Sequence, residues 1–352
     1  MSYSGSCIPS NPDISGIGVR TAIYAQNLLS FGPAIFAILD KKVTPIELDA
    51  LEQQSTTILI TAFAILLSAI VQACSLGLSN FHATIILNLS WINNTNTFIY
   101  FLLYAHHRAG LRLQQADRVR EGDTFILGGV DVEQQSKIDT IWSEVKKASR
   151  NVVLFIGSLH LSLMAAVGIW LWSRPATFGG SRPCSKSASV FILSQRVSLA
   201  SEGLRRWSLL VYSVVLTPVL NLIIPVLCFI ALFLVYYYMH PTPSAYGRSV
   251  APVACGFVVL ATINTVLVID TELAIGKNTP GLLDQGDMVW TFGQTLAILL
   301  LLVPIRDISM IMMERQPKRL GKKLLNAAKR GELEMVKDLL DQGAYADAKG
   351  EV

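Results

Sequence analysis

The chain has 352 residues, of which 52% are hydrophobic and 15% are charged, and its formal net charge is +4. An average soluble domain carries about 25% charged residues, so this composition argues against a water-soluble core and indicates a membrane protein with long uncharged segments. The five cysteines include no CxxC pair, so their spacing predicts neither a zinc site nor a redox centre.

Apolar segments follow one another along the chain and predict an all-α fold, a polytopic membrane helix bundle with about seven transmembrane helices. The N-terminus lacks a basic region before the first segment, so we expect no cleaved signal peptide. We divide the chain into an extracellular segment (1–19), a seven-helix transmembrane domain (20–313) and a cytosolic tail (314–352). The apolar segments lie near 20–39, 55–78, 81–104, 151–172, 208–239, 251–270 and 288–305.

The positions of lysine and arginine predict how the bundle is oriented. With the N-terminus outside, 21 of the 29 basic residues lie on the inner side and 8 on the outer side, as the positive-inside rule requires. Six of those 8 lie in the loop 173–207, which departs from the rule. We therefore expect an integral membrane protein with its N-terminus outside and its C-terminus in the cytosol, in the plasma membrane rather than an internal membrane.

The third segment carries five polar side chains, His82, Asn88, Asn93, Asn94 and Asn96, among Leu, Ile and Phe residues. On a helix with about 100° per residue they do not share one face. An amide that faced lipid would leave its hydrogen bonds unmade, at a high cost in free energy. We therefore predict that other helices surround this one, as the central rod of the bundle.

Local signals refine the boundaries of the helices. Thr44-Pro45-Ile46-Glu47 reads as a capping box with proline at the first helical position, so the second helix is predicted to begin near Pro45. Pro218 and Pro225 predict kinks in the fifth segment. The loop 173–207 should begin irregularly, and its later stretch from Val190 to Trp207 either lies along the membrane surface or folds over the bundle.

Charged residues follow the seventh segment directly. Arg306 and Asp307 should mark the inner boundary of the bilayer, because charges are costly deeper in the membrane. A basic cluster comes next, which anionic lipid headgroups would attract, although a stop-transfer signal explains the same charges. Its members are Arg315, Lys318, Arg319, Lys322 and Lys323.

The stretch from Leu324 to Ala344 follows the pattern AAKxGxxxxVxxLLxxGA and resembles a single ankyrin repeat, over about 322–350. The resemblance implies a short helix, a tight glycine turn and a second helix that ends at glycine. One repeat cannot bury its apolar face alone. It therefore implies either a chain truncated relative to longer relatives or a helix pair that docks on the membrane domain or on a cytosolic protein partner.

A second resemblance covers the membrane part, about residues 11–310. The run from Asn11 to Arg20 (NPDISGIGVR), with Tyr24, Gln26 and Asn27, and the later WINNTNT from Trp91 are similar to a group of uncharacterised fungal multi-pass membrane proteins. This resemblance implies the membrane fold and brings no activity with it.

Neutral polar side chains gather in the outer and middle parts of several predicted helices, with Thr262 and Thr265 of the sixth among them. They predict either an outward-opening cavity lined by hydrogen-bonding groups or interhelical contacts that hold the bundle together. The candidate ligand-binding residues are Gln26, Asn27, Gln72, His82, Asn88, Asn93, Thr291 and Gln294.

Other functional classes lack a signal in this sequence. No Asp, Glu, Lys or Arg lies in the middle of a predicted helix, which argues against an ion pump or proton-coupled transporter. His160 is the one titratable exception and is expected to be structural. Without HExxH or GxSxG we expect neither an enzyme nor a metal site, and no cofactor or nucleic-acid partner. A Cys74–Cys184 disulfide would pin the outer loop, although free thiols fit equally well.

Three roles remain open for such a protein. The first is a receptor-like sensor of a small neutral ligand, which would use the outer polar residues. The second is a facilitative carrier or channel for neutral solutes. The third is a membrane anchor for a cytosolic interaction module formed by the tail. In each case membrane lipid is an expected partner.

Overall fold

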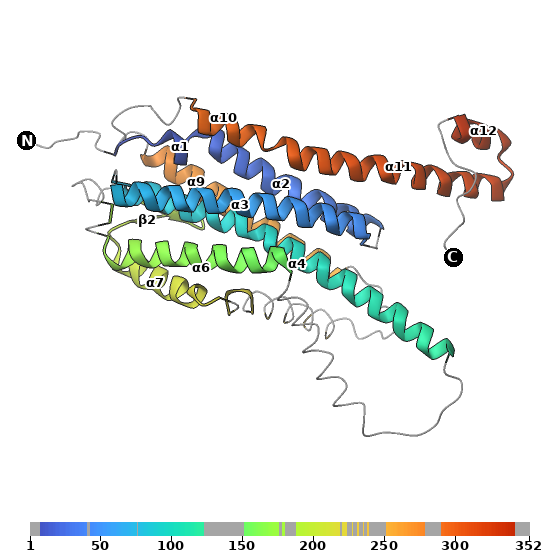
Figure 1. Ribbon diagram of the computed structural model, residues 1–352, viewed down its shortest axis with the longest axis horizontal. Helices are drawn as coiled ribbons and strands as arrows, with labels where there is room; N and C mark the ends of the chain where they lie inside the picture. Colours follow the sequence, from blue (N-terminus) through green and yellow to red (C-terminus); the bar gives the residue numbers. More distant parts are fainter. Residues whose placement is uncertain are drawn as a thin grey trace, which may run out of the picture. The chain divides into compact units, whose positions relative to one another are not determined.

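The structure is a computed structural model, and the described residues form two compact units within 1–301 and 302–352. The architecture is mostly helical (Figure 1), which confirms the predicted all-α class. Parts of the predicted segment 208–239, with Pro225, lie outside the described residues, and so does Cys184. The described residues are 8–40, 43–75, 77–122, 151–175, 178–179, 188–218, 220–223, 227, 231, 235, 238, 251–278 and 290–341.

The first unit is built from eight helices and one β-hairpin within its described residues. We call the end that holds the start of α2 and the end of α9 the outer end, following the predicted orientation, and the opposite end the inner end. The helices are α1 (Pro12–Ser15), α2 (Ile17–Asp40), α3 (Pro45–Ser75), α4 (Asn80–Gly122), α6 (Val152–Ser173), α7 (Glu202–Leu216), α9 (Ala251–Asn278) and α10 (Phe292–Leu299).

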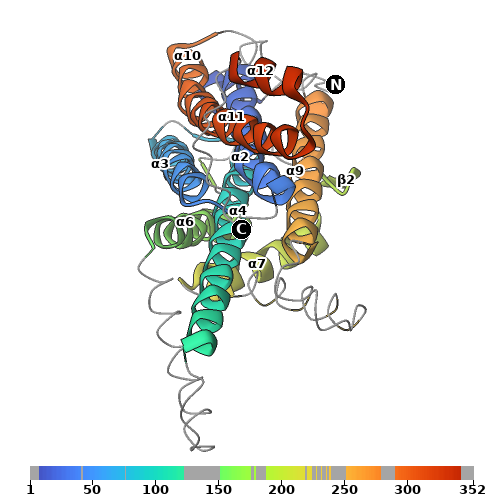
Figure 2. The same ribbon diagram turned by 90° about the vertical axis from the view of Figure 1, so that its right-hand side faces the viewer.

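Helix α4 is the central element of this unit, as predicted. It packs against α2, α3, α6 and α9, and Figure 2 shows it between them. Every side chain from residue 80 to 103 is buried except those of Asn88, Trp91 and Phe101, which are half-buried. The amides of this helix therefore face other helices rather than lipid.

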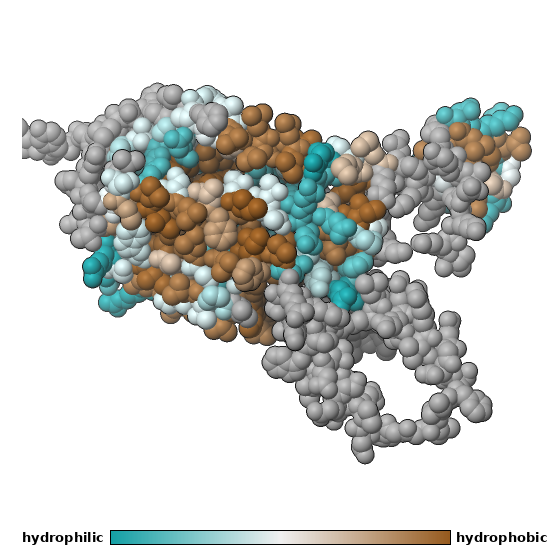
Figure 3. All heavy atoms as spheres, in the orientation of Figure 1, coloured by the Kyte–Doolittle hydropathy of each residue, from teal (hydrophilic) through white to brown (hydrophobic). Residues whose placement is uncertain are grey.

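Among the described residues, five helices are long and apolar enough to cross a membrane, by length and composition. Apolar side chains cover the middle of the face shown in Figure 3, over α3 and α6. The exposed apolar residues of these two helices include Ile60, Leu67 and Phe155. This surface indicates a membrane protein. Helix α4 is not among the five, because its buried amides lower its hydropathy. The five spans are Pro12–Leu39, Pro45–Ser75, Val152–Ser173, Val253–Asn278 and Gly293–Met313.

The start of α3 confirms the predicted capping box. The Thr44 backbone N–H donates to Glu47 Oε2 at 2.9 Å, and the Glu47 backbone N–H donates to Thr44 Oγ1 at 3.3 Å. Pro45 occupies the first helical position, where its missing N–H costs nothing. Helix α3 therefore begins well before its apolar segment.

The predicted kink at Pro218 takes the form of a helix end. Helix α7 stops at Leu216, and Thr217 is extended, with φ −75° and ψ 115°. The ring of a proline disfavours the helical conformation for the residue before it. The interruption is therefore a local property of the sequence.

Within the described part of the loop between α6 and α7, a β-hairpin packs along α9. Strands β1 (Ser189–Ile192) and β2 (Gln195–Ser198) pair antiparallel, and β1 packs along α9. Leu193 and Ser194 form the two-residue turn with φ of 50° and 63°. A left-handed backbone costs about 1–2 kcal/mol per non-glycine residue, and Leu-Ser lacks the Asn-Gly signature of such turns. Sequence patterns therefore did not predict the hairpin.

The second unit contains α11 (Leu302–Arg330) and α12 (Leu333–Asp341). Gly331 joins them with φ 73°. Its N–H donates to the carbonyl of Ala328 and that of Glu332 donates to Ala327, the pair of bonds that ends a helix at a left-handed glycine. The glycine turn matches the expectation, but the first helix is long, and the predicted tail boundary at 314 falls inside it.

The contact between α6 and α7 provides a test of the packing. A Cβ on Gly168 would lie 2.6 Å from the ring of Tyr212, whereas a Cβ on Gly276 of α9 would meet nothing within 4 Å. We predict that Gly168→Ala lowers the free energy of unfolding by about 1–3 kcal/mol, the usual cost of overpacking.

The matched variant Gly276→Ala should leave stability unchanged or raise it, because alanine favours the helix. Denaturation of both variants in detergent micelles checks the prediction. Equal stability of the two would contradict the close approach of α6 and α7.

Candidate functional site

Side-chain amides from three helices meet inside the first unit. This central amide network consists of Asn27 of α2, Asn93, Thr95 and Asn96 of α4, and Asn264 of α9, all buried. The Asn27 amide donates to Asn93 Oδ1 at 3.2 Å, and the Asn96 amide donates to Asn27 Oδ1 at 2.7 Å. The Asn264 amide donates to Thr95 Oγ1 at 2.8 Å.

These bonds bear on the choice between a ligand cavity and interhelical contacts. Asn27 and Asn93, two of the predicted ligand-binding residues, are 3% and 2% exposed and hydrogen-bond to each other. An amide that is already satisfied inside the protein gains little from a ligand. The geometry therefore favours the interhelical role for these two residues.

Helix α6 is joined to the bundle by a separate set of polar contacts. Asn94 Nδ2 lies 2.8 Å from Nδ1 of the buried His160, whose ring meets Phe63 edge-on at 5.2 Å. Ser158 Oγ donates to Asn221 Oδ1 at 2.9 Å, which ties α6 to the segment after Pro218. His160 thus has the packed, hydrogen-bonded surroundings expected of a structural histidine.

The inner end has its own tie between α3, α4 and α6. Tyr100 Oη donates to Glu52 Oε2 at 2.9 Å and accepts from Asn151 Nδ2 at 2.6 Å. His106 lies on α4 two residues beyond the predicted membrane span. Its pKa is lowered, mainly by burial and to a smaller extent by the neighbouring His107. The two bonds of Tyr100 hold α3, α4 and the start of α6 together at the inner end.

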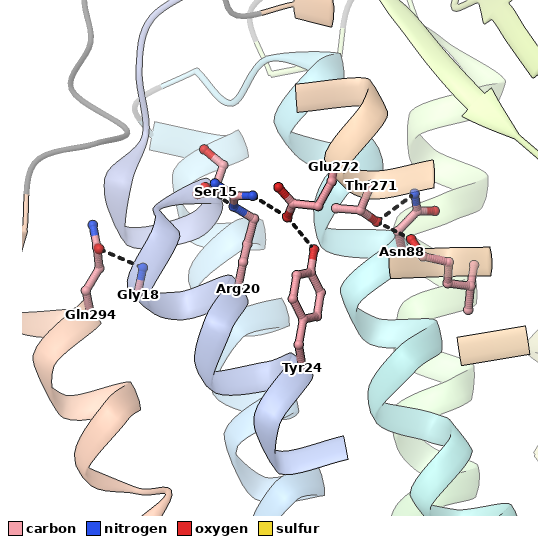
Figure 4. Close-up of polar contacts among 9 residues, drawn as sticks. Ser15, Gly18, Arg20, Tyr24, Asn88, Thr271, Glu272 and Gln294 are labelled. Carbon is pink, nitrogen blue, oxygen red and sulfur yellow. Dashed lines mark hydrogen bonds and ion pairs between the residues drawn. The ribbon is translucent and has the colours of Figure 1, made fainter. Parts of the chain in front are cut away.

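A charged cluster lies at the outer end, where α2 meets α9 (Figure 4). Arg20 forms an ion pair with Glu272, and its Nε donates to the Ser15 carbonyl at 2.8 Å. Tyr24 Oη, one turn along α2, donates to the same Glu272 oxygen at 2.9 Å. We call Arg20, Tyr24 and Glu272 the outer polar cluster.

The two charges of this cluster differ in exposure. The Arg20 side chain is 7% exposed and the Glu272 side chain 45%. A buried guanidinium is costly without a paired anion, so Glu272 compensates Arg20 while part of its carboxylate faces outward. Within the described residues, the hydrogen bonds that reach Glu272 come to Oε1 alone. The second oxygen, Oε2, accepts no hydrogen bond from another described residue.

The bond between Asn88 and Thr271 lies close to this cluster, as Figure 4 shows. Asn88 Nδ2 donates to Thr271 Oγ1 at 3.4 Å, and Thr271 itself bonds to the carbonyl of Leu267. Asn88 is half-buried, so of the amides predicted to bind ligand on α4 it is the one nearest to solvent.

Two of the predicted ligand-binding residues lie at the starts of helices. Ser79 Oγ caps α4, since it accepts from the His82 backbone N–H at 3.2 Å and lies 2.7 Å from His82 Nδ1. Thr291 caps α10 by accepting from the Gln294 backbone N–H. Their local hydrogen bonds support helix ends.

The remaining predicted residues fasten the N-terminal segment to its neighbours. Gln72 Oε1 accepts from Asn11 Nδ2 at 2.6 Å. Gln294 Oε1 accepts from the Gly18 N–H at 2.9 Å, and its Nε2 donates to the Pro12 carbonyl at 3.1 Å. Gln26 is buried. The eight predicted residues therefore do not form one site.

The sequence also singled out two threonines of α9, a basic cluster and a cysteine pair. Thr262 and Thr265 are exposed, and each donates a hydrogen bond to a backbone carbonyl of its own helix. Lys323 is exposed. Cys74 is exposed, and because Cys184 lies outside the described residues the Cys74–Cys184 disulfide stays a prediction. The side chains of the other basic-cluster residues also lie outside: Arg315, Lys318, Arg319 and Lys322.

Sequence patterns missed the outer polar cluster and Asn264. Arg20 entered the orientation count as a basic residue of the outer side, although it opens the first apolar segment with Tyr24 one turn later on the same face. That spacing was the available signal. Within the described residues, no three His, Cys, Asp or Glu side chains are grouped to hold a metal ion.

The central amide network predicts a stability difference between two polar residues. We expect Asn27→Ala to lower the free energy of unfolding by about 2 kcal/mol, because it leaves buried partners unsatisfied. Thr262→Ala, which removes only a bond to its own helix, should change it by less than about 0.5 kcal/mol. Unfolding by dodecyl sulfate in mixed micelles measures both, and equal values would contradict the interhelical role of Asn27.

No family model matches the chain. No curated protein and no solved structure matches it either.

Proposed function

We propose that this chain is a receptor-like membrane sensor of a small neutral ligand, which binds at the outer polar cluster. The bundle would have seven transmembrane helices, with the N-terminus outside and the C-terminus in the cytosol of a cell whose plasma membrane holds it. The five apolar helices, the buried α4 and the fifth segment that begins in α7 support that number.

The half-exposed carboxylate of Glu272, held by the buried Arg20 and by Tyr24, carries this proposal. Ionisable groups within a membrane bundle are rare and commonly functional. The two charges cancel, so the cluster suits a neutral molecule that donates a hydrogen bond to Glu272 Oε2. A hydroxyl or an amide meets that requirement.

Ligand binding at this position would act on two helices that contact the centre of the bundle. Arg20 and Tyr24 belong to α2, and Glu272 belongs to α9. The same two helices meet α4 again at the central amide network, through Asn27 and Asn264. A ligand that alters the spacing of α2 and α9 at the outer end therefore acts on helices that are coupled further along. A carrier, by contrast, would require this network to open.

A panel of neutral hydroxyl- and amide-bearing compounds tests the proposal by thermal stabilisation of the detergent-solubilised protein. A ligand at about 100 times its Kd stabilises the folded state by about 2.7 kcal/mol. We predict that at least one compound raises the Tm of the natural protein and that Glu272→Gln abolishes the shift.

The matched control is Glu202→Gln, which removes another exposed carboxylate that pairs with Arg206 on α7. It should leave the ligand-induced shift unchanged. A shift that survives Glu272→Gln would place the ligand elsewhere. Uptake of the labelled compound into vesicles that contain only this protein would favour a carrier instead.

A second role, a membrane anchor for an interaction module, has support from the second unit. Its hydrophobic core consists of Leu324, Ala327 and Leu339. Leu333 and Met335 are 70% and 52% exposed. So small a core is marginal without further burial, and the ankyrin-like pattern of this segment is typical of protein-binding repeats.

Cross-linking through the exposed lysine Lys337 in native membranes tests this second role. We predict cross-links to one defined cytosolic protein, which Leu333→Lys reduces several-fold because it places a charge on the apolar surface. The control Lys323→Glu changes a charge on α11 and should retain them. Cross-links confined to this chain would contradict an anchor.

A further inference from the structure

The hairpin of β1 and β2 carries an apolar tip that no part of the proposed ligand site explains. Ile192 and Leu193, at the turn, are 40% and 71% exposed. Ser189 and Val190, at the base, are buried. Exposed apolar side chains at the end of a hairpin are unfavourable in water, so their surroundings require an explanation.

Helix α9 holds the hairpin at two points. At the base, the Ser189 N–H donates to Asn278 Oδ1 at 3.0 Å, and Asn278 Nδ2 donates to the Ser189 carbonyl at 2.7 Å. At the tip, the backbone N–H groups of Leu193 and Ser194 donate to the two carboxylate oxygens of Asp270 at 2.9 and 2.7 Å. The base of the hairpin therefore lies nearer to the C-terminal end of α9 than the tip of the hairpin does.

The lengths of the two elements show the direction of the hairpin. From Asn278 back to Asp270 the helix rises about 12 Å, at 1.5 Å per residue. From Ser189 to Leu193 a strand spans about 13 Å. The hairpin thus runs along α9 from the outer end towards the middle of the bundle. Figure 2 shows it projecting to the side of α9.

The surroundings of the tip are continuous with the apolar surface of the bundle. Ile269 and Leu273 of α9, which flank Asp270 and Glu272, are 44% and 40% exposed. Both belong to a helix apolar enough to cross a membrane. The tip therefore lies where the lipid-facing surface of α9 meets its charged outer turns.

The Asp270 carboxylate explains how the backbone of the turn can lie beside the apolar surface of α9. Backbone N–H groups in an apolar layer cannot leave their hydrogen bonds to water. Asp270 is 4% exposed, and its carboxylate accepts from both N–H groups of the turn. Arg196 on β2 has its Nε directed to Ser189 Oγ, at the base of the hairpin, as expected if its charge stays at the headgroup level.

We infer that the Ile192–Leu193 tip inserts into the lipid leaflet at the outer end, to a shallow interfacial depth, and that Asp270 is the positioning residue for the turn. The partner is the phospholipid surface itself. This lateral contact anchors α9 and the loop before α7 against the membrane, independently of any ligand at the outer polar cluster.

Fluorescence quenching in vesicles tests the inference. In a protein whose native cysteines are replaced, Leu193→Cys carries a nitrobenzoxadiazole probe in phosphatidylcholine vesicles that contain doxyl lipids. We expect blue-shifted emission and quenching at least twofold stronger by 5-doxyl than by 12-doxyl lipid. A probe at the exposed Ala200, just after β2, should emit as in water and be quenched at most half as strongly.

Two further variants separate positioning from folding. Asp270→Asn retains one acceptor oxygen and should keep a reduced blue shift of the Leu193 probe, whereas Asp270→Ala should lose most of it while the circular dichroism stays helical. The Leu193 probe in the protein that keeps Asp270 decides the matter without either variant. Emission and quenching at Leu193 equal to those at Ala200 would overturn the inference.

Discussion

A side-chain amide inside an apolar layer has to find its hydrogen-bond partner within the protein, and the first unit depends on this constraint. Helix α4 carries amides on several faces, so it is stable only where other helices surround it. Helices α2 and α9 supply partners through Asn27 and Asn264, and α6 supplies His160. The polar residues that lower the hydropathy of α4 are thus the ones that fix its neighbours.

Helix α9 satisfies polar groups from three other parts of the chain. Asn264, Thr271 and Asn278 follow one another at intervals of seven residues, which places them on one face. They bond to Thr95, Asn88 and Ser189, respectively. Asp270 and Glu272 flank this face and hold the hairpin turn and Arg20. One helix therefore ties together the central rod, the N-terminal helix and the outer loop, which makes it the natural element to couple the outer end to the interior.

Features that depend on neighbouring residues in the chain were predictable. The capping box at Thr44 and Glu47, the break at Pro218 and the glycine turn at Gly331 all follow from local backbone chemistry. The burial of α4 was predictable as well, because no lipid-facing arrangement could satisfy its amides. The ion pair of Arg20 and Glu272 was not, since 252 residues separate them in the chain. Nor was the hairpin, whose Leu-Ser turn is stabilised by a carboxylate on a distant helix rather than by its own sequence.

The sequence alone therefore determined that this protein is a helical membrane bundle with the third segment at its centre. It also determined where most of the helices begin. Only the tertiary structure decided which amide bonds to which. Asn27 hydrogen-bonds to Asn93 and Asn96, and Glu272 forms an ion pair with Arg20. Thr262 and Thr265 are exposed instead. The physical reason is that hydropathy and periodicity depend on a residue and its close neighbours, whereas a hydrogen bond between helices depends on the rotation and depth of both, which the packing of the whole bundle sets.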